Sequence, residues 1–294
     1  MATLREIRGR IVGVKKTQKI TKAMKMVAAA KFRRAQRNVV QARPYAAKMK
    51  QLLNHLYTNP EASAHPFIQP RNVNAVALVI VTSDRGFCGA FNSNLVKTAE
   101  RLINANYKTL HEQGKVRLFC IGKKGADYFS KRGHSIAGKY IGVYSNLVFG
   151  EAQKVAREVI DGYTKGEFDR VDIVSNVFKS AAQQTTVTEQ FLPIPGDAFD
   201  GDGADSVDYI YEPSDIAIID ALIPKHLNFQ LWRLLLESNA AEEGARMTAM
   251  ENATTNANEL IRYLQLSYNK ARQAAITSEL LEIVGGAEAL RKAG

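Results

Sequence analysis

Apolar and small side chains recur at steps of three and four residues near both ends of the chain. The first seam runs from Leu4 to Leu56, and the second runs from Met250 to Leu281 and is rich in Ala and Ser. A narrow seam of near-heptad period is typical of a coiled coil, and small seam residues let two helices lie close together. The pattern predicts one coiled-coil helix over residues 1–56 and another over residues 213–286, which pair with each other or with another protein.

Two prolines and a glycine pair should disturb these helices. Pro44 lacks a backbone N–H, so we expect it to bend or interrupt the first helix just after Arg43. Pro224 is expected to kink the second helix. Gly285 and Gly286 are expected to loosen the end of that helix, because glycine has a low helix propensity.

The central part of the chain, residues 73–208, has a different pattern. Short apolar runs bounded by polar residues are typical of buried strands, and helical patterns separate them. The predicted strands are Val76–Val81, Val116–Ile121 and Val171–Val177, with Thr185–Leu192 as an additional strand, and the predicted helices are Asn94–Glu112, Lys124–Arg132 and Gly150–Tyr163. Strands that alternate with helices indicate a mostly parallel α/β sheet.

The positive charge of the chain is concentrated in its first segment. The formal net charge is +11, yet residues 1–56 alone carry fifteen Lys and Arg against a single acid, Glu6. A basic arm indicates an acidic partner, which need not be nucleic acid. A basic coiled-coil protein that binds nucleic acid would explain the charge, but the aromatic side chains available for base stacking in this segment are Phe32 and Tyr45 alone. A solvated or protein-facing surface is the other interpretation.

The segment Ser83–Asn92, with sequence SDRGFCGAFN, is the most suggestive candidate site. It follows a predicted strand and precedes a predicted helix, where α/β folds place phosphate-binding loops. Its spacing matches neither the dinucleotide fingerprint nor the Walker loop, so a tight structural turn is the favoured interpretation. A dinucleotide-dependent enzyme would account for the α/β domain but lacks this fingerprint.

Other chemistry finds little support in the sequence. The five histidines show no metal-ligand spacing, and no catalytic constellation is recognisable, so we expect no catalytic residue, cofactor or metal site. Cys88 and Cys120 lie in apolar surroundings and are expected to be buried, reduced thiols. The longest apolar run, Val76–Val81, is too short to span a bilayer, and no signal peptide is visible.

Four motifs in chain order resemble the gamma subunits of bacterial F-type ATP synthases. They are TQKITKAMKMVAAAK at Thr17–Lys31, SDRGFCGAFN at Ser83–Asn92, EGARMTAMENAT at Glu243–Thr254 and NKARQAAITSELLEIV at Asn269–Val284. The resemblance covers the whole chain. It implies an α/β fold plus a long coiled coil, in which antiparallel N- and C-terminal helices carry an inserted Rossmann-like α/β domain.

The resemblance also implies a function and a set of partners. The chain would be the non-catalytic central rotor shaft that couples transmembrane proton or sodium flow to ATP synthesis or hydrolysis in a ring of alpha and beta subunits. Its other partners would be the epsilon subunit and the membrane rotor ring of c subunits, with no nucleic acid and no direct membrane insertion. It would lie at the cytoplasmic face of the bacterial plasma membrane as a peripheral part of the complex.

Eight positions match family residues that contact partners. Met24, Arg246, Gln273 and Thr277 match positions that contact the beta subunits, while Tyr209, Tyr211 and Glu212 match the foot that faces the rotor ring, and Cys88 falls in the part near epsilon. Gln273 and Thr277 lie four residues apart, so they share one face of the predicted helix. From the residues alone, a merely solvated face is the favoured interpretation.

Overall fold

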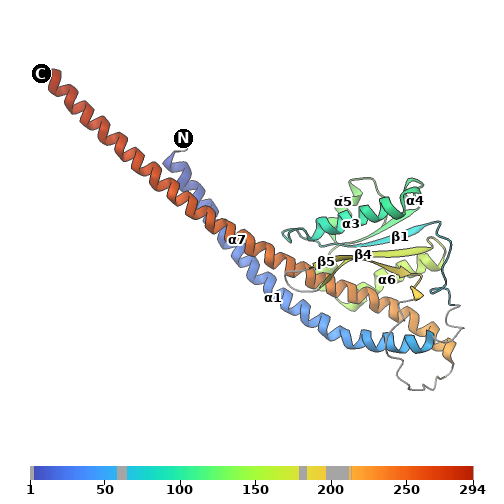
Figure 1. Ribbon diagram of the computed structural model, residues 1–294. Helices are drawn as coiled ribbons and strands as arrows, with labels where there is room; N and C mark the ends of the chain where they lie inside the picture. The colour runs from blue at the N-terminus through green and yellow to red at the C-terminus, as the bar shows by residue number, and fades with distance from the viewer. Residues whose placement is uncertain (1–2, 58–64, 179–183, 197–211, 213, 294) are drawn as a thin grey trace. The chain divides into compact units, whose positions relative to one another are not determined.

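The computed structural model describes residues 3–57, 65–178, 184–196, 212 and 214–293 (Figure 1). Its main elements in chain order are α1 (Leu4–Tyr57), β1 (Val76–Val81), α3 (Phe91–Asn106), α4 (Lys108–Glu112), β2 (Val116–Ile121), α5 (Lys123–Ser130), β3 (Ile136–Tyr140), η1 (Val143–Asn146), α6 (Phe149–Thr164), β4 (Arg170–Phe178), β5 (Gln184–Leu192) and α7 (Asp215–Ala293). They form two compact units, one made of Met1–Val27 with Ala249–Gly294 and one made of Ala28–Thr248.

The first unit consists of the beginning of α1 and the end of α7, which run side by side in opposite directions (Figure 1). Hydrogen bonds join Gln18 to Asn258 and Thr21 to Thr254 across the pair. The seam residues at the centre of the pair are buried, namely Ile7 and Thr21 on α1 and Met250, Ala257 and Leu264 on α7. The antiparallel pairing of the two ends of the chain is therefore confirmed.

The expected interruption at Pro44 is wrong, because α1 continues through this residue to Tyr57. Pro44 cannot donate to the carbonyl of Val40, four residues earlier. Val40 is 54% exposed, so water can satisfy that carbonyl and the helix need not end.

α7 is one continuous helix that includes Pro224, Gly285 and Gly286. Pro224 lies in the early part of the helix, where the side-chain amide of Asn228 donates a hydrogen bond to its carbonyl at 2.7 Å. Gly285 and Gly286 lie inside the helix, which ends at Ala293. The residues that follow this glycine pair are mostly Ala, Glu, Leu, Arg and Lys, which favour helix strongly enough to offset the glycines.

The second unit contains a five-stranded sheet in the order β3-β2-β1-β4-β5. β1 pairs in parallel with β2 and β4, and β2 pairs in parallel with β3. β5 is antiparallel to β4. The mostly parallel Rossmann-like sheet is thus confirmed, as are the strands at Val76–Val81 and Val116–Ile121, whereas the sequence analysis missed β3.

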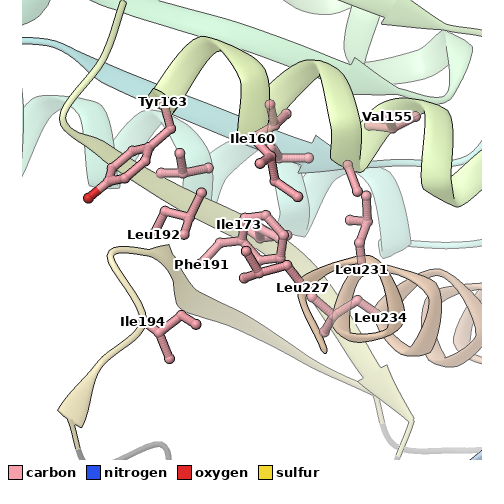
Figure 2. Packing of buried hydrophobic residues seen from close by; sticks show 14 of the residues in the cluster. Val155, Ile160, Tyr163, Ile173, Phe191, Leu192, Ile194, Leu227, Leu231 and Leu234 are labelled. Carbon is pink, nitrogen blue, oxygen red and sulfur yellow. The ribbon is translucent and has the colours of Figure 1, made fainter. Parts of the chain in front are cut away.

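Alternate residues of β1 pack into two separate hydrophobic clusters, one on each face of the sheet. Ala77, Val79 and Val81 face a cluster that contains side chains of α6, the end of α1 and the start of α7. Figure 2 shows Val155, Ile160 and Tyr163 of α6 meeting Leu227, Leu231 and Leu234 of α7 around Ile173 and Phe191 of the sheet.

The opposite face of the sheet is covered by α3 and α5. Val76, Leu78 and Ile80 of β1 lie in the second cluster with Leu95 of α3 and Phe129 of α5. Ala241 and Ala245 of α7 also belong to this second cluster. Through its successive turns, α7 is therefore packed into the cores on both faces of the sheet.

Candidate functional site

The loop after β1 is held by hydrogen bonds among its own polar groups. Asn92 Oδ1 accepts from the backbone N–H of Ser83 at 3.0 Å, and Asn92 Nδ2 donates to Ser83 Oγ at 2.7 Å. Ser83 Oγ in turn donates to the carbonyl of Arg85 at 2.6 Å. Because these groups serve one another, the geometry supports the structural-turn interpretation of Ser83–Asn92.

Asp84 joins this loop to two neighbouring loops at the C-terminal edge of the parallel strands. Its carboxylate accepts from the backbone N–H of Lys123, at the start of α5, at 3.0 Å, and from the backbone N–H of Gly142, after β3, at 3.1 Å. Ligands of open α/β sheets bind at this edge. Here the backbone donors at that edge bind a carboxylate of the chain itself.

Gly122 lies directly against the end of β1 at the C-terminal edge of the parallel strands. Its φ is +94°, and a Cβ on this residue would lie 2.1 Å from the carbonyl oxygen of Thr82. The Thr82 hydroxyl accepts from the backbone N–H of Gly125 at 2.9 Å. The turn from β2 into α5 is thus pressed against the end of β1, and glycine is required there for both conformation and space.

Side chains of α7 pack near the point where the strand order reverses, between β1 and β4. Cys88 of the loop after β1 and Val174 of β4 share a buried cluster with Ala241 and Ala245 of α7. Nucleotides bind at such a switch point in doubly wound sheets. In this chain the switch point is instead part of the packing against the long helix.

The next turn of α7 carries a cluster of buried charges. The guanidinium of Arg246 lies 2.5 Å from the carboxylate of Glu242 and 3.0 Å from that of Glu243. Lys31 of α1 lies 3.8 Å from Glu243. Burial raises the pKa of Glu242 to about 7, and Arg246 opposes that rise.

A cavity of about 320 Å³ opens beside this cluster. Its lining is polar and carries charges of both signs, contributed by Lys31, Arg34, Asn38, Asp84, Arg85, Tyr144, Asn239, Glu242, Glu243 and Arg246, among others. Such a lining suits a polar, charged segment of a partner better than an apolar ligand.

The structure separates the residues predicted to contact beta subunits into different environments. Arg246 is 9% exposed and is paired within its own chain. Met24 is half-buried in the two-helix unit. Gln273 and Thr277 are both exposed one turn apart on α7, and the Thr277 hydroxyl donates to the Gln273 carbonyl at 2.9 Å.

The residues predicted to contact the rotor ring and epsilon differ in their exposure to solvent. Tyr209 and Tyr211 lie outside the described residues, and Glu212 is exposed. Cys88 is 2% exposed, so it contributes to packing and not to a surface. Burial raises the pKa of the Cys88 thiol, and the nearby Arg246 works against that rise.

The last part of α7 exposes large apolar side chains. From Ile276 onward every described side chain of this helix is exposed. The exposed apolar residues there are Ile276, Leu280, Leu281, Ile283, Val284 and Leu290. Figure 1 shows this end of α7 continuing past the N-terminal end of α1, its helical partner.

The contacts of Asp84, Glu242 and Glu243 were not predicted from the sequence. The signal for the two glutamates was present, because acids three and four residues before an arginine face it on a helix. No local signal identifies Asp84, since its backbone donors come from loops that are distant in sequence.

The described residues contain neither a candidate membrane span nor a candidate metal-binding cluster. None of the helices there is both long and apolar enough to cross a membrane. No group of three or more His, Cys, Asp or Glu in the same part of the chain could hold a metal ion.

Comparisons with known proteins agree with one another. A family model described as ATP synthase matches residues 3–290. The ATP synthase gamma chain of Chlorobaculum tepidum is 55% identical over 293 residues, which cover 99% of this chain and 100% of the relative. A chain in the cryo-EM structure of the Tetrahymena thermophila mitochondrial ATP synthase central stalk and c-ring is 26% identical with a TM-score of 0.60, and the match covers 80% of this chain and 99% of that one.

A second solved structure supports the fold alone. A chain of the Euglena gracilis mitochondrial ATP synthase, from a structure of OSCP, F1 and the c-ring, has a TM-score of 0.68 at 23% identity. The match covers 98% of this chain and 94% of that one.

Proposed function

The chain belongs to the ATP synthase gamma chain family, and from this premise we propose that it is the rotating central shaft of an F-type ATP synthase. In this role it couples transmembrane flow of protons or sodium ions to ATP synthesis or hydrolysis in a ring of alpha and beta subunits. The Tetrahymena relative comes from a structure described as a central stalk with its c-ring, which supports the same place for this chain.

The observation that carries the proposal is the antiparallel pair formed by α1 and α7. The paired seam is built largely from small and mid-sized side chains, and polar contacts join the helices at Gln18–Asn258, Thr21–Thr254 and Lys25–Glu251. Small seam residues keep two helices close together, which gives a slender element. A slender two-helix element suits the axis of a ring of subunits.

The end of α7 is proposed to lie inside that ring. Its large apolar side chains from Ile276 to Leu290 are exposed beyond the start of α1, and exposed apolar surface of this kind marks sites of protein association. Gln273 and Thr277 lie next to this stretch and are exposed, so they are available to contact beta subunits.

Met24 and Arg246 complete the proposed beta contacts. Met24 is half-buried, so part of its side chain can touch a neighbour. Arg246 lines the polar cavity while it holds Glu242 and Glu243. We propose that it acts mainly by shaping that cavity, into which a charged segment of a beta subunit fits.

The base of the shaft is proposed to bind the rotor ring and epsilon. Glu212 is exposed and is available for the c-ring, with Tyr209 and Tyr211 as its proposed neighbours. Cys88 is buried, so any effect of this residue on epsilon acts through the loop that it supports. The complex would lie peripherally on the cytoplasmic face of a bacterial plasma membrane.

The proposed mechanism is a population shift in the beta subunits. Because the sides of the two-helix unit carry different side chains, three beta subunits around it meet different surfaces. A beta conformation that makes better contacts with the surface it meets is stabilised, and its nucleotide affinity changes accordingly. Turning the shaft moves each surface to the next beta subunit.

The chain itself is proposed to be non-catalytic. The edge of the sheet where α/β enzymes bind nucleotides is engaged by Asp84, by the tight turn at Gly122 and by Ala241 and Ala245 of α7. The backbone donors of Lys123 and Gly142 are thereby bonded within the chain.

Reconstitution with alpha and beta subunits tests the function. A probe is attached at Lys165→Cys, an exposed position, in a background with Cys88→Ala and Cys120→Ala. We expect the probe to rotate in one direction with three pauses per turn while the complex hydrolyses ATP. The proposal fails if the ring hydrolyses ATP beside a stationary probe, or if the purified chain binds nucleic acid and no ring subunits.

A further inference from the structure

Polar contacts join α1 and α7 on successive turns of the two-helix unit. They are Gln18 to Asn258 at 3.0 Å, Thr21 to Thr254 at 2.8 Å, and Lys25 to Glu251 at 2.6 Å. The first and third contacts are exposed, whereas the threonine pair lies within the partly buried seam. All three contacts fit a single antiparallel alignment of the helices.

The two threonine hydroxyls take part in three hydrogen-bond contacts. Thr21 Oγ1 lies 3.1 Å from the carbonyl of Gln18, and Thr254 Oγ1 lies 2.7 Å from the carbonyl of Met250. Each hydroxyl has one proton, so two protons serve three contacts. The shorter distance favours Thr254 as the donor within its own helix, which leaves the proton of Thr21 to cross the seam to Thr254.

The neighbouring seam positions of α7 specify the alignment only weakly. Ala253 and Ala257 flank Thr254, and each has only a methyl group as its side chain. A slide of one heptad would place Thr21 opposite Ile261, which offers no hydroxyl. A polar residue buried in the seam of a coiled coil is known to specify the register of the helices.

We propose that the Thr21–Thr254 pair is a register lock that fixes the lengthwise alignment of α1 and α7. The two threonines act as positioning residues, since their hydroxyls bond to each other across the helix pair and otherwise to carbonyls of their own helices. The lock is a property of the chain itself, whether or not the chain turns in a ring. In a shaft under load, the lock would keep the helices from sliding past each other.

Distances between spin labels on the two helices test the lock in the full-length chain. Labels are placed at Arg8→Cys and Tyr263→Cys, both exposed, in a background with Cys88→Ala and Cys120→Ala. A slide that places Thr21 opposite Ile261 increases the offset between the labels along the helix axis by one heptad, about 10 Å. Double electron–electron resonance measures the distance between the two labels.

The informative variant is Thr21→Val combined with Thr254→Val, which keeps the side-chain shape and removes both hydroxyls. We expect its distance distribution to gain a second population at longer distance. Thr21→Ser combined with Thr254→Ser retains the hydroxyls and should restore the single native distance. Thr17→Val is the matched control, because that exposed hydroxyl bonds to Gly13 of its own helix at 3.2 Å.

An unchanged single distance in the double valine variant overturns the lock, as does an equal displacement in the Thr17→Val control or in the serine pair. If circular dichroism shows that the double valine variant does not fold, the single variants decide. Each single variant removes the cross-helix bond, so a displaced population in both supports the lock, and its absence from both refutes it.

Discussion

Arg246 and Glu242 lie one turn apart on α7, and the guanidinium of Arg246 is 2.5 Å from the carboxylate of Glu242 although both side chains are buried. Glu243 lies on the other side of the same guanidinium at 3.0 Å. A residue matched to a subunit contact is therefore also the counter-ion of two acids in its own chain. Its substitution should affect stability as well as coupling.

Arg246→Ala should lower the free energy of unfolding by about 3–5 kcal/mol, because it leaves buried carboxylates without their cation. Urea unfolding followed by circular dichroism measures this loss. Arg37→Ala, at an exposed position of α1, is the control and should change stability by no more than about 0.5 kcal/mol. A loss below about 1 kcal/mol for Arg246→Ala would show that the cluster is not held by this residue.

Replacing Gln273 and Thr277 together by Ala should leave the fold intact, because both side chains are exposed. A hydrogen bond made to a beta subunit in one rotary state alone is worth roughly 0.5–1.5 kcal/mol. Its loss should change ATP turnover of the assembled complex several-fold, since about 1.4 kcal/mol is a factor of ten in rate.

The control for this double substitution is Ser278→Ala, one residue further along and on another side of the helix. Gel filtration checks assembly, and a coupled ATPase assay measures turnover. Unchanged turnover in an intact complex that carries both alanines would leave this face with no role in coupling.

Gly122→Ala should destabilise the second unit by more than about 2 kcal/mol. The substitution adds backbone strain at a φ of +94° and a clash with the Thr82 carbonyl oxygen, 2.1 Å from the new Cβ. Gly133→Ala is the matched control, since Gly133 has a φ of +75° and open space around it. Thermal unfolding of both variants separates strain from the clash, and equal losses would argue against a tight turn at Gly122.

His226 should make stability depend on pH in the acid range. Burial, with a smaller effect from Arg233, lowers the pKa of His226 to about 4 from 6.5. The unfolded chain therefore binds an additional proton between these values, so the folded state loses stability as the pH falls from about 6.5 to 4. Over this range the loss is of the order of 1–3 kcal/mol.

His226→Gln should flatten this part of the stability profile, while His111→Gln should preserve it. Unfolding free energies measured in urea at pH 4 to 7 check the difference. A wild-type profile that runs parallel to that of His226→Gln would show that His226 does not contribute.

Both thiols should react slowly with a disulfide reagent in the folded chain. Cys88 and Cys120 are buried and unpaired, and burial raises the pKa of Cys120 to about 12. Since the thiolate is the reactive form, mild oxidants should leave the ATPase rate of the complex unchanged. Rapid labelling of either thiol without unfolding, or a dithiol-reversible change in that rate, would contradict this expectation.

Periodicity was sufficient to identify the elements whose pattern is local and strong. The runs Val76–Val81 and Val116–Ile121 are fully or almost fully apolar, and β1 and β2 have the same bounds. β3 was missed because IAGKY is short, has a central glycine and leaves Ala137 and Lys139 exposed at the sheet edge. An edge strand buries too little for its sequence to be distinctive.

The interruption predicted at Pro44 does not occur, because the surroundings offset the cost of proline in the helix. Pro44 sits on an exposed face, where water can serve the unpaired carbonyl of Val40, so its cost is small enough for the helix to continue. The charged cluster around Arg246 was partly predictable from helical spacing. Its contact with Lys31 of α1 depends on the packing of segments more than two hundred residues apart, which no local pattern encodes.

The pairing of the first helix with the last also sets the order of events during synthesis. Thr21 leaves the ribosome 233 residues before its partner Thr254. At about 5–20 residues per second, that interval lasts roughly 10–50 s. During this interval the beginning of α1 has no helix to pack against. Helices in proteins gain most of their stability from packing of this kind. The newly made N-terminal segment is therefore without its helical partner for most of the time that the chain is being synthesised.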